Sequence, residues 1–189
     1  VTRTIDCGST IQGIANGDML IENVKFIGNT FIHCRQAFEH FIRSKEGTAK
    51  YSDCEFSSNR CFEMGENEFS TPETRDAALL SYERKPITGL SINKNFFWGS
   101  SAYCNQYCTA EMSENTFYVF KDQYLLFNRW QPQDAVFADE EGGIDKMRKV
   151  LGNESDKIFI VDRGDSQLRS KIISEHFKGA EDDIKRLCK

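Results

Sequence analysis

Three glutamates, Glu63, Glu66 and Glu68, form the densest acidic group in the middle of the chain. At separations of two or three residues, their carboxylates can lie on one side of a strand or turn. Calcium binds where several such oxygens converge. A solvated surface is the commoner role for a group of this kind, and the sequence leaves both interpretations open.

Arg84, Lys85 and Lys94 are the basic candidates for the base of a lyase reaction. A lysine or arginine can neutralise an acidic ligand or remove a proton from it. Scattered cations are also ordinary surface residues. Arg84 and Lys94 are therefore candidates for ligand binding rather than an assigned site.

The chain has seven cysteines and three histidines. Cys104 and Cys108 lack a second closely spaced pair, so no zinc or other metal site is expected. His33 and Cys34 are adjacent, and neighbours on a strand point to opposite faces, which disfavours a Cys/His catalytic pair. The odd number of cysteines favours reduced, buried thiols over a disulfide framework, and with them an intracellular location.

Aromatic residues are dense in one part of the chain, where Phe96, Phe97 and Trp98 precede Tyr103 and Tyr107. Aromatic rings stack on sugar rings and also anchor protein interfaces. About half of such rings are expected in a core. Trp98, Tyr103 and Tyr107 are the candidates for ligand contact.

A repeated pattern predicts the elements that would position these residues. Each copy has alternating apolar residues, two small or polar residues, Asn or Cys, one further residue, and Phe. The four copies span residues 24–31, 49–56, 90–97 and 110–117. Alternation predicts a short strand, and Asn suits a tight corner because it tolerates unusual backbone angles.

The spacing of the repeats indicates a solenoid. Phe31 and Phe56 are 25 residues apart, and Phe97 and Phe117 are 20 apart. The 41 residues from Phe56 to Phe97 are interpreted as two coils. Periods of about 20–29 residues are typical of single-layer solenoids rather than antiparallel sandwiches.

The segment Ile92-Asn93-Lys94-Asn95-Phe96-Phe97 resembles the repeat of the right-handed parallel β-helix proteins of the pectate-lyase-like superfamily. The resemblance covers about residues 18–125. It implies a mostly β, single-stranded parallel β-helix in which Asn29, Asn95 and Asn115 form a ladder. Cys54 replaces Asn in one coil, which departs from the pattern.

The resemblance also implies chemistry. Enzymes of this superfamily act on acidic sugars with carboxylate-bound calcium or with a Lys/Arg pair. The closely spaced Asp pairs and Gly-His-Gly expected of polygalacturonase-like hydrolases are absent, as is an Asp-Pro-His-Glu segment. The catalytic residues are therefore unknown. No cofactor is expected, unless the protein is a lyase that uses calcium.

After about residue 125 the pattern changes, so the chain is divided into a β-helix (1–125) and an α/β cap or small module (126–189). A strand at 133–138, a helix from 143, a strand at 157–162 and helices at 167–177 and 180–188 are expected. Residues 69–86 are expected to form a loop that projects from one coil.

Composition limits the partners. The net charge of −5 and the lack of a dense basic run disfavour nucleic acid. No apolar stretch reaches the roughly 18–20 residues that a membrane span needs. The chain begins with Val1 and lacks a signal-peptide apolar region, so it is expected to be a mature form or an excised piece.

Two hypotheses follow. The first is a carbohydrate-interacting β-helix that binds or cleaves a polysaccharide along the coil surface, as a lyase or glycoside hydrolase if it is an enzyme. The second is a non-catalytic protein-interaction module of viral or bacterial origin.

Overall fold

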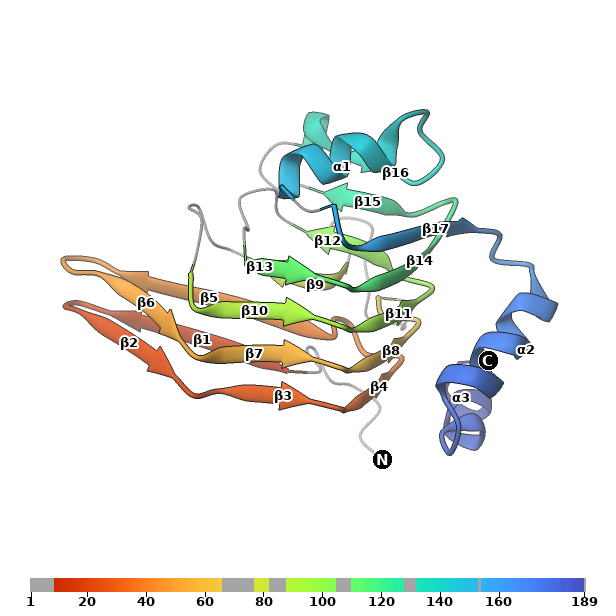
Figure 1. Cartoon of the computed structure of the whole chain (residues 1–189), viewed down its shortest axis with the longest axis horizontal. Coiled ribbons are helices and arrows are strands. Elements are labelled where there is room, and N and C mark those ends of the chain that lie inside the picture. The colour runs from red at the N-terminus through yellow and green to blue at the C-terminus, as the bar shows by residue number, and fades with distance from the viewer. Residues whose placement is uncertain are drawn as a thin grey trace.

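A computed structural model describes residues 9–65, 77–81, 88–104, 110–127, 132–152 and 154–188. These parts of the chain are mostly strand, and nearly all strand pairs are parallel (Figure 1). The chain passes repeatedly through the same sheets, and one such circuit is called a coil here. The expected mostly β class with parallel sheets is confirmed.

The first sheet takes one strand from each coil in parallel. Its strands are β1 (Thr10–Ala15), β5 (Phe38–Ser44), β9 (Ala77–Ser81), β12 (Ser101–Cys104) and β15 (Tyr124–Phe127). A short antiparallel strand, β16 (Val136–Phe137), pairs with β15 after the 3-10 turn Pro132–Asp134. This antiparallel pair ends the sheet.

The other sheets follow the same order of coils. The second contains β3 (Lys25–Ile27), β7 (Cys54–Ser57), β10 (Leu90–Asn93) and β13 (Glu111–Ser113), and the pair β2 (Met19–Glu22) and β6 (Ala49–Ser52) precedes it along the chain. The third contains β4 (Thr30–Ile32), β8 (Arg60–Phe62), β11 (Phe96–Trp98), β14 (Thr116–Phe120) and β17 (Lys157–Val161).

Stacked side chains between the sheets form the main core. Because side chains alternate along a strand, residues at matching positions of successive strands lie above one another. Phe97 and Phe117 are such a pair, with ring centroids 4.5 Å apart and planes 6° apart. Phe38 and Phe56 stack from different sheets at 4.6 Å. All four rings are almost completely buried.

An asparagine ladder runs along the corner that precedes the third sheet. The Nδ2 amide of Asn59 donates to Asn95 Oδ1 at 3.0 Å, and that of Asn95 donates to Asn115 Oδ1 at 2.9 Å. Asn29 donates to Asn59 at 3.1 Å from the exposed end. The ladder therefore contains the predicted Asn29, Asn95 and Asn115.

The prediction that Cys54 replaces Asn in one coil is wrong, because the ladder position is Asn59. The first two coils each have two similar corners before the third sheet, and the segment 49–56 contains the first of them rather than the second. Phe56 accordingly pairs with Phe26, and Cys61 pairs with Phe31. The Cys54 thiol instead lies 3.4 Å from the carbonyl oxygen of Ile21.

The interpretation of residues 56–97 as two coils is also wrong. Asn59 and Asn95 are ladder neighbours although they are 36 residues apart, so a single coil contains the insertion. Within the expected loop 69–86, residues 77–81 form β9, which pairs with β5 and β12. This segment, Ala-Ala-Leu-Leu-Ser, lacks the apolar/polar alternation that identifies a strand. The other residues of the range 69–86 lie outside the described parts of the chain.

The strand expected at 133–138 is reduced to β16, because Pro132–Asp134 form a 3-10 turn. The other C-terminal elements agree with the sequence predictions in type and position. They are α1 (Gly143–Leu151), β17, α2 (Ser166–His176) and α3 (Glu181–Leu187). Asp165 caps α2 by accepting a hydrogen bond from the Leu168 amide at 2.9 Å. The division proposed after residue 125 falls within β15, and β17 extends the third sheet beside β14.

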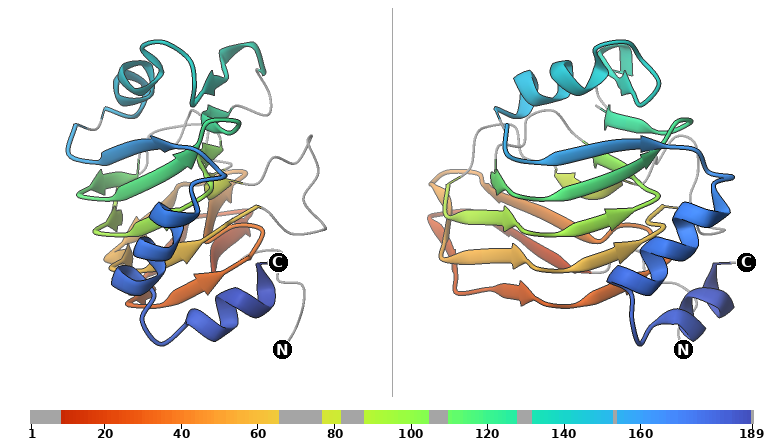
Figure 2. Two further views of the ribbon diagram at one scale, coloured as in Figure 1. Left: turned by 90° about the vertical axis from the view of Figure 1, so that its right-hand side faces the viewer. Right: turned by 45° about the vertical axis from the view of Figure 1, so that its right-hand side comes forward.

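The C-terminal helices pack on two different surfaces of the stacked coils (Figure 2). Helix α1 lies over β15 and β16 at the end of the coils, where Met147 joins the main core. Helices α2 and α3 lie beside the coils and pack Ile172, Phe177 and Ile184 against the outer face of the third sheet. Helix α1 thus covers the end of the coils, while α2 and α3 cover a side.

Candidate functional site

A row of apolar residues on the outer face of the third sheet carries several aromatic rings that lie outside the main core. Its members are paired with one another in successive strands of the sheet. We call them the outer row: Ile32, Phe62, Trp98, Tyr118 and Phe159. Neighbouring rings lie 6.4, 5.5 and 4.8 Å apart from Phe62 to Phe159.

The two ends of the outer row differ in exposure. Helix α2 ends against Phe62, whose ring meets Phe177 at 5.0 Å, and Phe62 and Trp98 are buried. Beyond the helix, Tyr118 is only partly buried and Phe159 is 44% exposed. Tyr118 and Phe159 thus form an aromatic pair that reaches the surface.

Polar groups at the end of α2 lie near the Tyr118 member of this pair. The His176 ring stacks on Phe96, 4.0 Å between centroids, and Phe96 in turn lies 5.6 Å from Tyr118. Burial raises the pKa of the Tyr118 hydroxyl, and the charge of Glu175 raises it further. Burial lowers the pKa of His176, which favours the neutral ring, and Glu175 partly opposes this shift.

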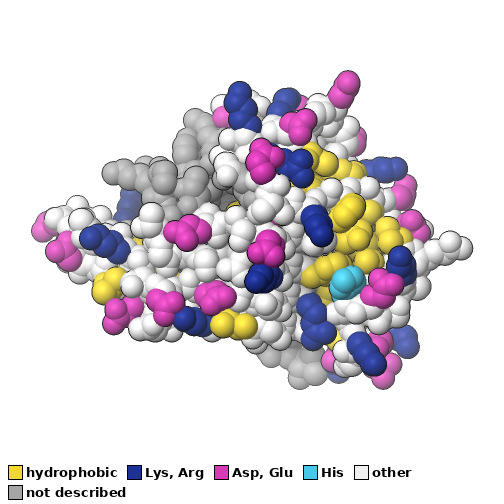
Figure 3. Space-filling view, in the orientation of Figure 1, with side chains coloured by type: hydrophobic (Ala, Val, Ile, Leu, Met, Phe, Trp, Pro, Cys, Tyr) yellow, Lys and Arg dark blue, Asp and Glu magenta, His cyan; other side chains and the backbone are white. Residues whose placement is uncertain are grey.

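Figure 3 shows the surface that results. Hydrophobic side chains gather where the third sheet meets α2, and a histidine and several charged side chains surround them. Exposed apolar patches with a polar border mark sites of protein interaction or ligand binding.

The structure places the predicted site residues apart from one another. Trp98 is 1% exposed in the outer row, so its ring system has no face open to a ligand. The prediction that Trp98 stacks on a ligand is therefore wrong. Its position opposite Phe62 and under α2, rather than its residue type, decides this. Lys94 is exposed at the ladder corner, with φ 55°. The backbone of Tyr103 lies in β12, but its side chain is outside the described part.

Glu63, the first residue of the acidic group, is paired with a basic residue. Its carboxylate accepts a hydrogen bond from Arg169 Nε at 3.2 Å, so it faces the C-terminal helices. The remaining candidates, Glu66, Glu68, Arg84 and Tyr107, lie outside the described residues.

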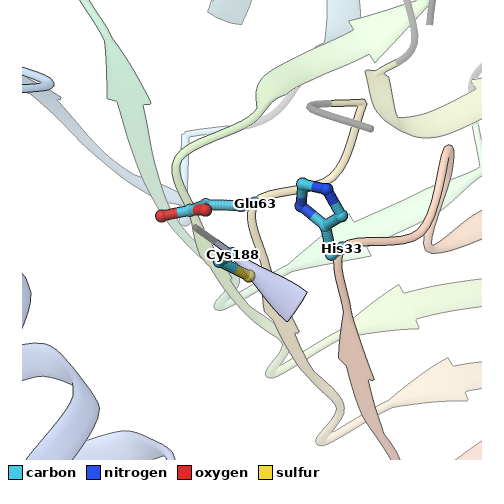
Figure 4. Close-up of side chains that lie close together, drawn as sticks. All are labelled: His33, Glu63 and Cys188. Carbon is cyan, nitrogen blue, oxygen red and sulfur yellow. The ribbon is translucent and has the colours of Figure 1, made fainter. Parts of the chain in front are cut away.

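A second cluster joins Glu63 to His33 and Cys188. Ligand atoms of these three partly buried side chains all lie within 4.8 Å of one another (Figure 4). Burial raises the pKa of the Cys188 thiol, and a hydrogen bond to Glu63 together with its charge raises it further. No metal site was expected from the sequence, because these residues are far apart along the chain and belong to no short motif.

Comparisons with protein-family models, curated proteins and solved structures find no match to this chain. Among the described residues, no helix is both long and apolar enough to span a membrane. The proposed function therefore depends on the residues of this chain alone.

Proposed function

We propose that the protein is a right-handed parallel β-helix, similar to the pectate-lyase-like superfamily, that binds carbohydrate on the outer face of its third sheet. The repeated parallel pairing and the asparagine ladder support this fold. Parallel strands joined by a crossover are right-handed in about 98% of cases, which supports the handedness. Fold alone does not support a function, so the binding proposal rests on the site.

The exposed Tyr118–Phe159 pair is the observation that carries the proposal. These rings are stacked with planes 22° apart, and Phe159 ends the row because β17 is the last strand of its sheet. One face of Phe159 therefore has no ring of the row against it. An open aromatic face binds the C–H face of a sugar, and neighbouring polar groups bind its hydroxyls.

Glu175 and His176 supply those polar groups. A neutral imidazole can donate one hydrogen bond and accept another, and a carboxylate accepts several. Hydrolysis of a glycosidic bond ordinarily uses two carboxylates that flank it. Glu175 is one carboxylate beside the pair, so binding rather than cleavage is proposed, and calcium is not required by it.

The test compares Phe159→Ala with Phe137→Ala. Phe137 is a matched control, because it is also a strand phenylalanine and is 45% exposed, on β16. Retardation of the purified chain is measured in gels that contain acidic or neutral polysaccharides. We expect at least one polysaccharide to retard the wild type, with affinity about 10-fold lower in Phe159→Ala and unchanged in Phe137→Ala.

Absence of retardation on every polysaccharide, or an equal loss in both variants, would contradict the proposal. Incubation with acidic polysaccharides, with and without calcium, separates binding from cleavage. Growth of ultraviolet absorbance from unsaturated products would identify a lyase instead of a binding protein.

A protein-interaction module is the second candidate, and the first coil supports it. Ile14, Leu20 and Ile27 are 65, 56 and 52% exposed. They lie on β1, β2 and β3, each the terminal strand of its sheet within the described parts of the chain. Unpaired strand edges beside apolar side chains favour the addition of a protein strand. Chemical cross-linking of the wild type and of Leu20→Glu, compared side by side, tests this alternative.

A further inference from the structure

The corner that follows the third sheet stacks His33 above Glu63. His33 follows β4 and Glu63 follows β8, in successive coils. Each donates its backbone amide to the next coil, His33 to Phe62 O at 2.8 Å and Glu63 to Trp98 O at 2.7 Å. Both have left-handed backbones, with φ 55° and 52°. This conformation is uncommon for residues other than glycine, and here the strand pairing on both sides maintains it.

Cys188 reaches the same corner from the end of the chain. It caps α3, with its amide bonded to Ile184 O at 2.9 Å, and α3 packs against β4. Figure 4 shows Glu63 and the His33 ring side by side, with Cys188 directed at the space beside them. Three elements that are distant in sequence thus direct one nitrogen, one oxygen and one sulfur ligand to a common point.

We propose that His33, Glu63 and Cys188 bind a divalent transition-metal ion, for which zinc is the best fit. Zinc prefers nitrogen, sulfur and carboxylate ligands at about 2.0–2.3 Å, which places ligand atoms about 3.3–3.7 Å apart in a tetrahedral site. The present limit of 4.8 Å requires side-chain shifts of about an ångström to reach that geometry. Calcium and magnesium prefer oxygen ligands alone, so they fit this set poorly.

The His33 ring gives independent support. Its Nδ1 atom is buried and has no hydrogen-bond partner among the described residues. A buried polar atom without a partner costs about 1–3 kcal/mol, so it is uncommon unless a missing ion or water satisfies it. A metal ion at the centre of the cluster would satisfy the ring nitrogen.

Arg169 holds the carboxylate in place. Its Nε atom lies 3.2 Å from Glu63 Oε1, which leaves Oε2 for the metal, and its guanidinium lies 5.1 Å from the Phe62 ring centre. Groups that hydrogen-bond a ligand in this way orient it. The charges are compatible: the Cys188 thiolate and the Glu63 carboxylate neutralise the divalent ion, and the thiol proton leaves to solvent.

All three side chains are only partly buried, so a fourth coordination position is open to water. Metal binding is also expected to stabilise the fold. A bound ion would link α3 to two coils and stabilise the folded chain by an amount that grows with the logarithm of the free ion concentration. This inference is independent of carbohydrate binding, which uses the opposite end of the outer row.

The test titrates zinc and cobalt into the chain after treatment with a chelator. Cys188→Ser and His33→Ala remove ligands, and Cys54→Ser is the matched control because it removes a buried thiol elsewhere. We expect a tight site of one ion in wild type and Cys54→Ser, with affinity at least about 10-fold lower in the other two. Cobalt should show thiolate charge-transfer absorbance that disappears in Cys188→Ser.

Thermal unfolding gives a second measurement. Zinc should raise the Tm of wild type and Cys54→Ser and leave that of Cys188→Ser unchanged. Circular dichroism checks that each variant is folded. The proposal is overturned if wild type binds neither metal, if Cys188→Ser binds as tightly as wild type, or if the cobalt complex lacks the thiolate bands.

Discussion

The Asn115 amide donates to both carboxylate oxygens of Asp156, at 3.1 and 3.2 Å. The same carboxylate accepts the Asn115 backbone amide at 2.8 Å. Asp156 therefore ends the asparagine ladder, because a carboxylate only accepts hydrogen bonds and has no donor of its own to satisfy. It also joins the last coil to the segment that leads into β17, 41 residues later in the chain.

Replacement of Asp156 by alanine should destabilise the fold. It would leave two buried donors of Asn115 without an acceptor, at about 1–3 kcal/mol for each. The free energy of unfolding, measured with urea, should fall by about 3 kcal/mol. Asp156→Asn, which keeps one acceptor oxygen, should cost less. Asp122→Ala is the control, because it removes only a surface ion pair with Arg163 worth about 0–1 kcal/mol.

Within the ladder, position should determine the cost of a substitution. Asn95→Ala removes the acceptor of the buried Asn59 amide and the donor to Phe56 O, so we expect a loss of about 2–4 kcal/mol. Asn29→Ala, at the exposed end, should cost less than about 1 kcal/mol. Equal losses in urea unfolding would show that the ladder does not act as a buried network.

Stability should fall in mild acid because of His40. This side chain is completely buried, which lowers its pKa from 6.5 to about 3. Between those pH values the unfolded chain binds the proton and the folded chain does not, so protons favour unfolding. The stability of the folded chain is therefore free of this penalty above pH 6.5. Below that pH the free energy of unfolding decreases by up to about 1.4 kcal/mol per pH unit because of His40.

Urea unfolding of wild type and His40→Phe at several pH values measures this effect. The difference between the two slopes isolates the histidine from the carboxylates, which also titrate in acid. A wild-type slope equal to that of His40→Phe from pH 6 to pH 4 would contradict the assignment.

Phe177 should determine whether α2 and α3 stay docked. It is completely buried against Phe62 and Phe96, at 5.0 and 5.9 Å between ring centres. Phe177→Ala should cost about 3–5 kcal/mol locally and expose the two helices to protease. Phe137→Ala, at an exposed phenylalanine, should leave the digestion pattern unchanged.

Gly89 should tolerate no side chain. Its φ is +79°, and a Cβ atom would lie 2.2 Å from the backbone oxygen of Tyr51. Gly89→Ala should therefore lower the free energy of unfolding by more than about 2 kcal/mol, because backbone of the neighbouring coil cannot move aside. Gly152→Ala is the control: its φ is +63°, but no atom lies within 4 Å, so only the backbone cost of about 1–2 kcal/mol is expected.

The local elements of this protein were largely predictable from the sequence. Alternating apolar residues identified most strands near the ladder, and helical spacing identified α1, α2 and α3. These features depend on neighbours along the chain. The errors came from the repeat itself: the second coil has two similar corners before the third sheet, so Cys54 was aligned where Asn59 belongs.

Burial and long-range proximity required the tertiary structure. Trp98 has the residue type of a binding site, yet Phe177 and its helix cover the outer row at that level and leave Tyr118 and Phe159 at the surface. His33, Glu63 and Cys188 share no motif, since strand register and the docking of α3 bring them together. The sequence determined which residues form strands and corners. Only the stacking of the coils decided which side chains meet, because those distances depend on coil length and not on local preference.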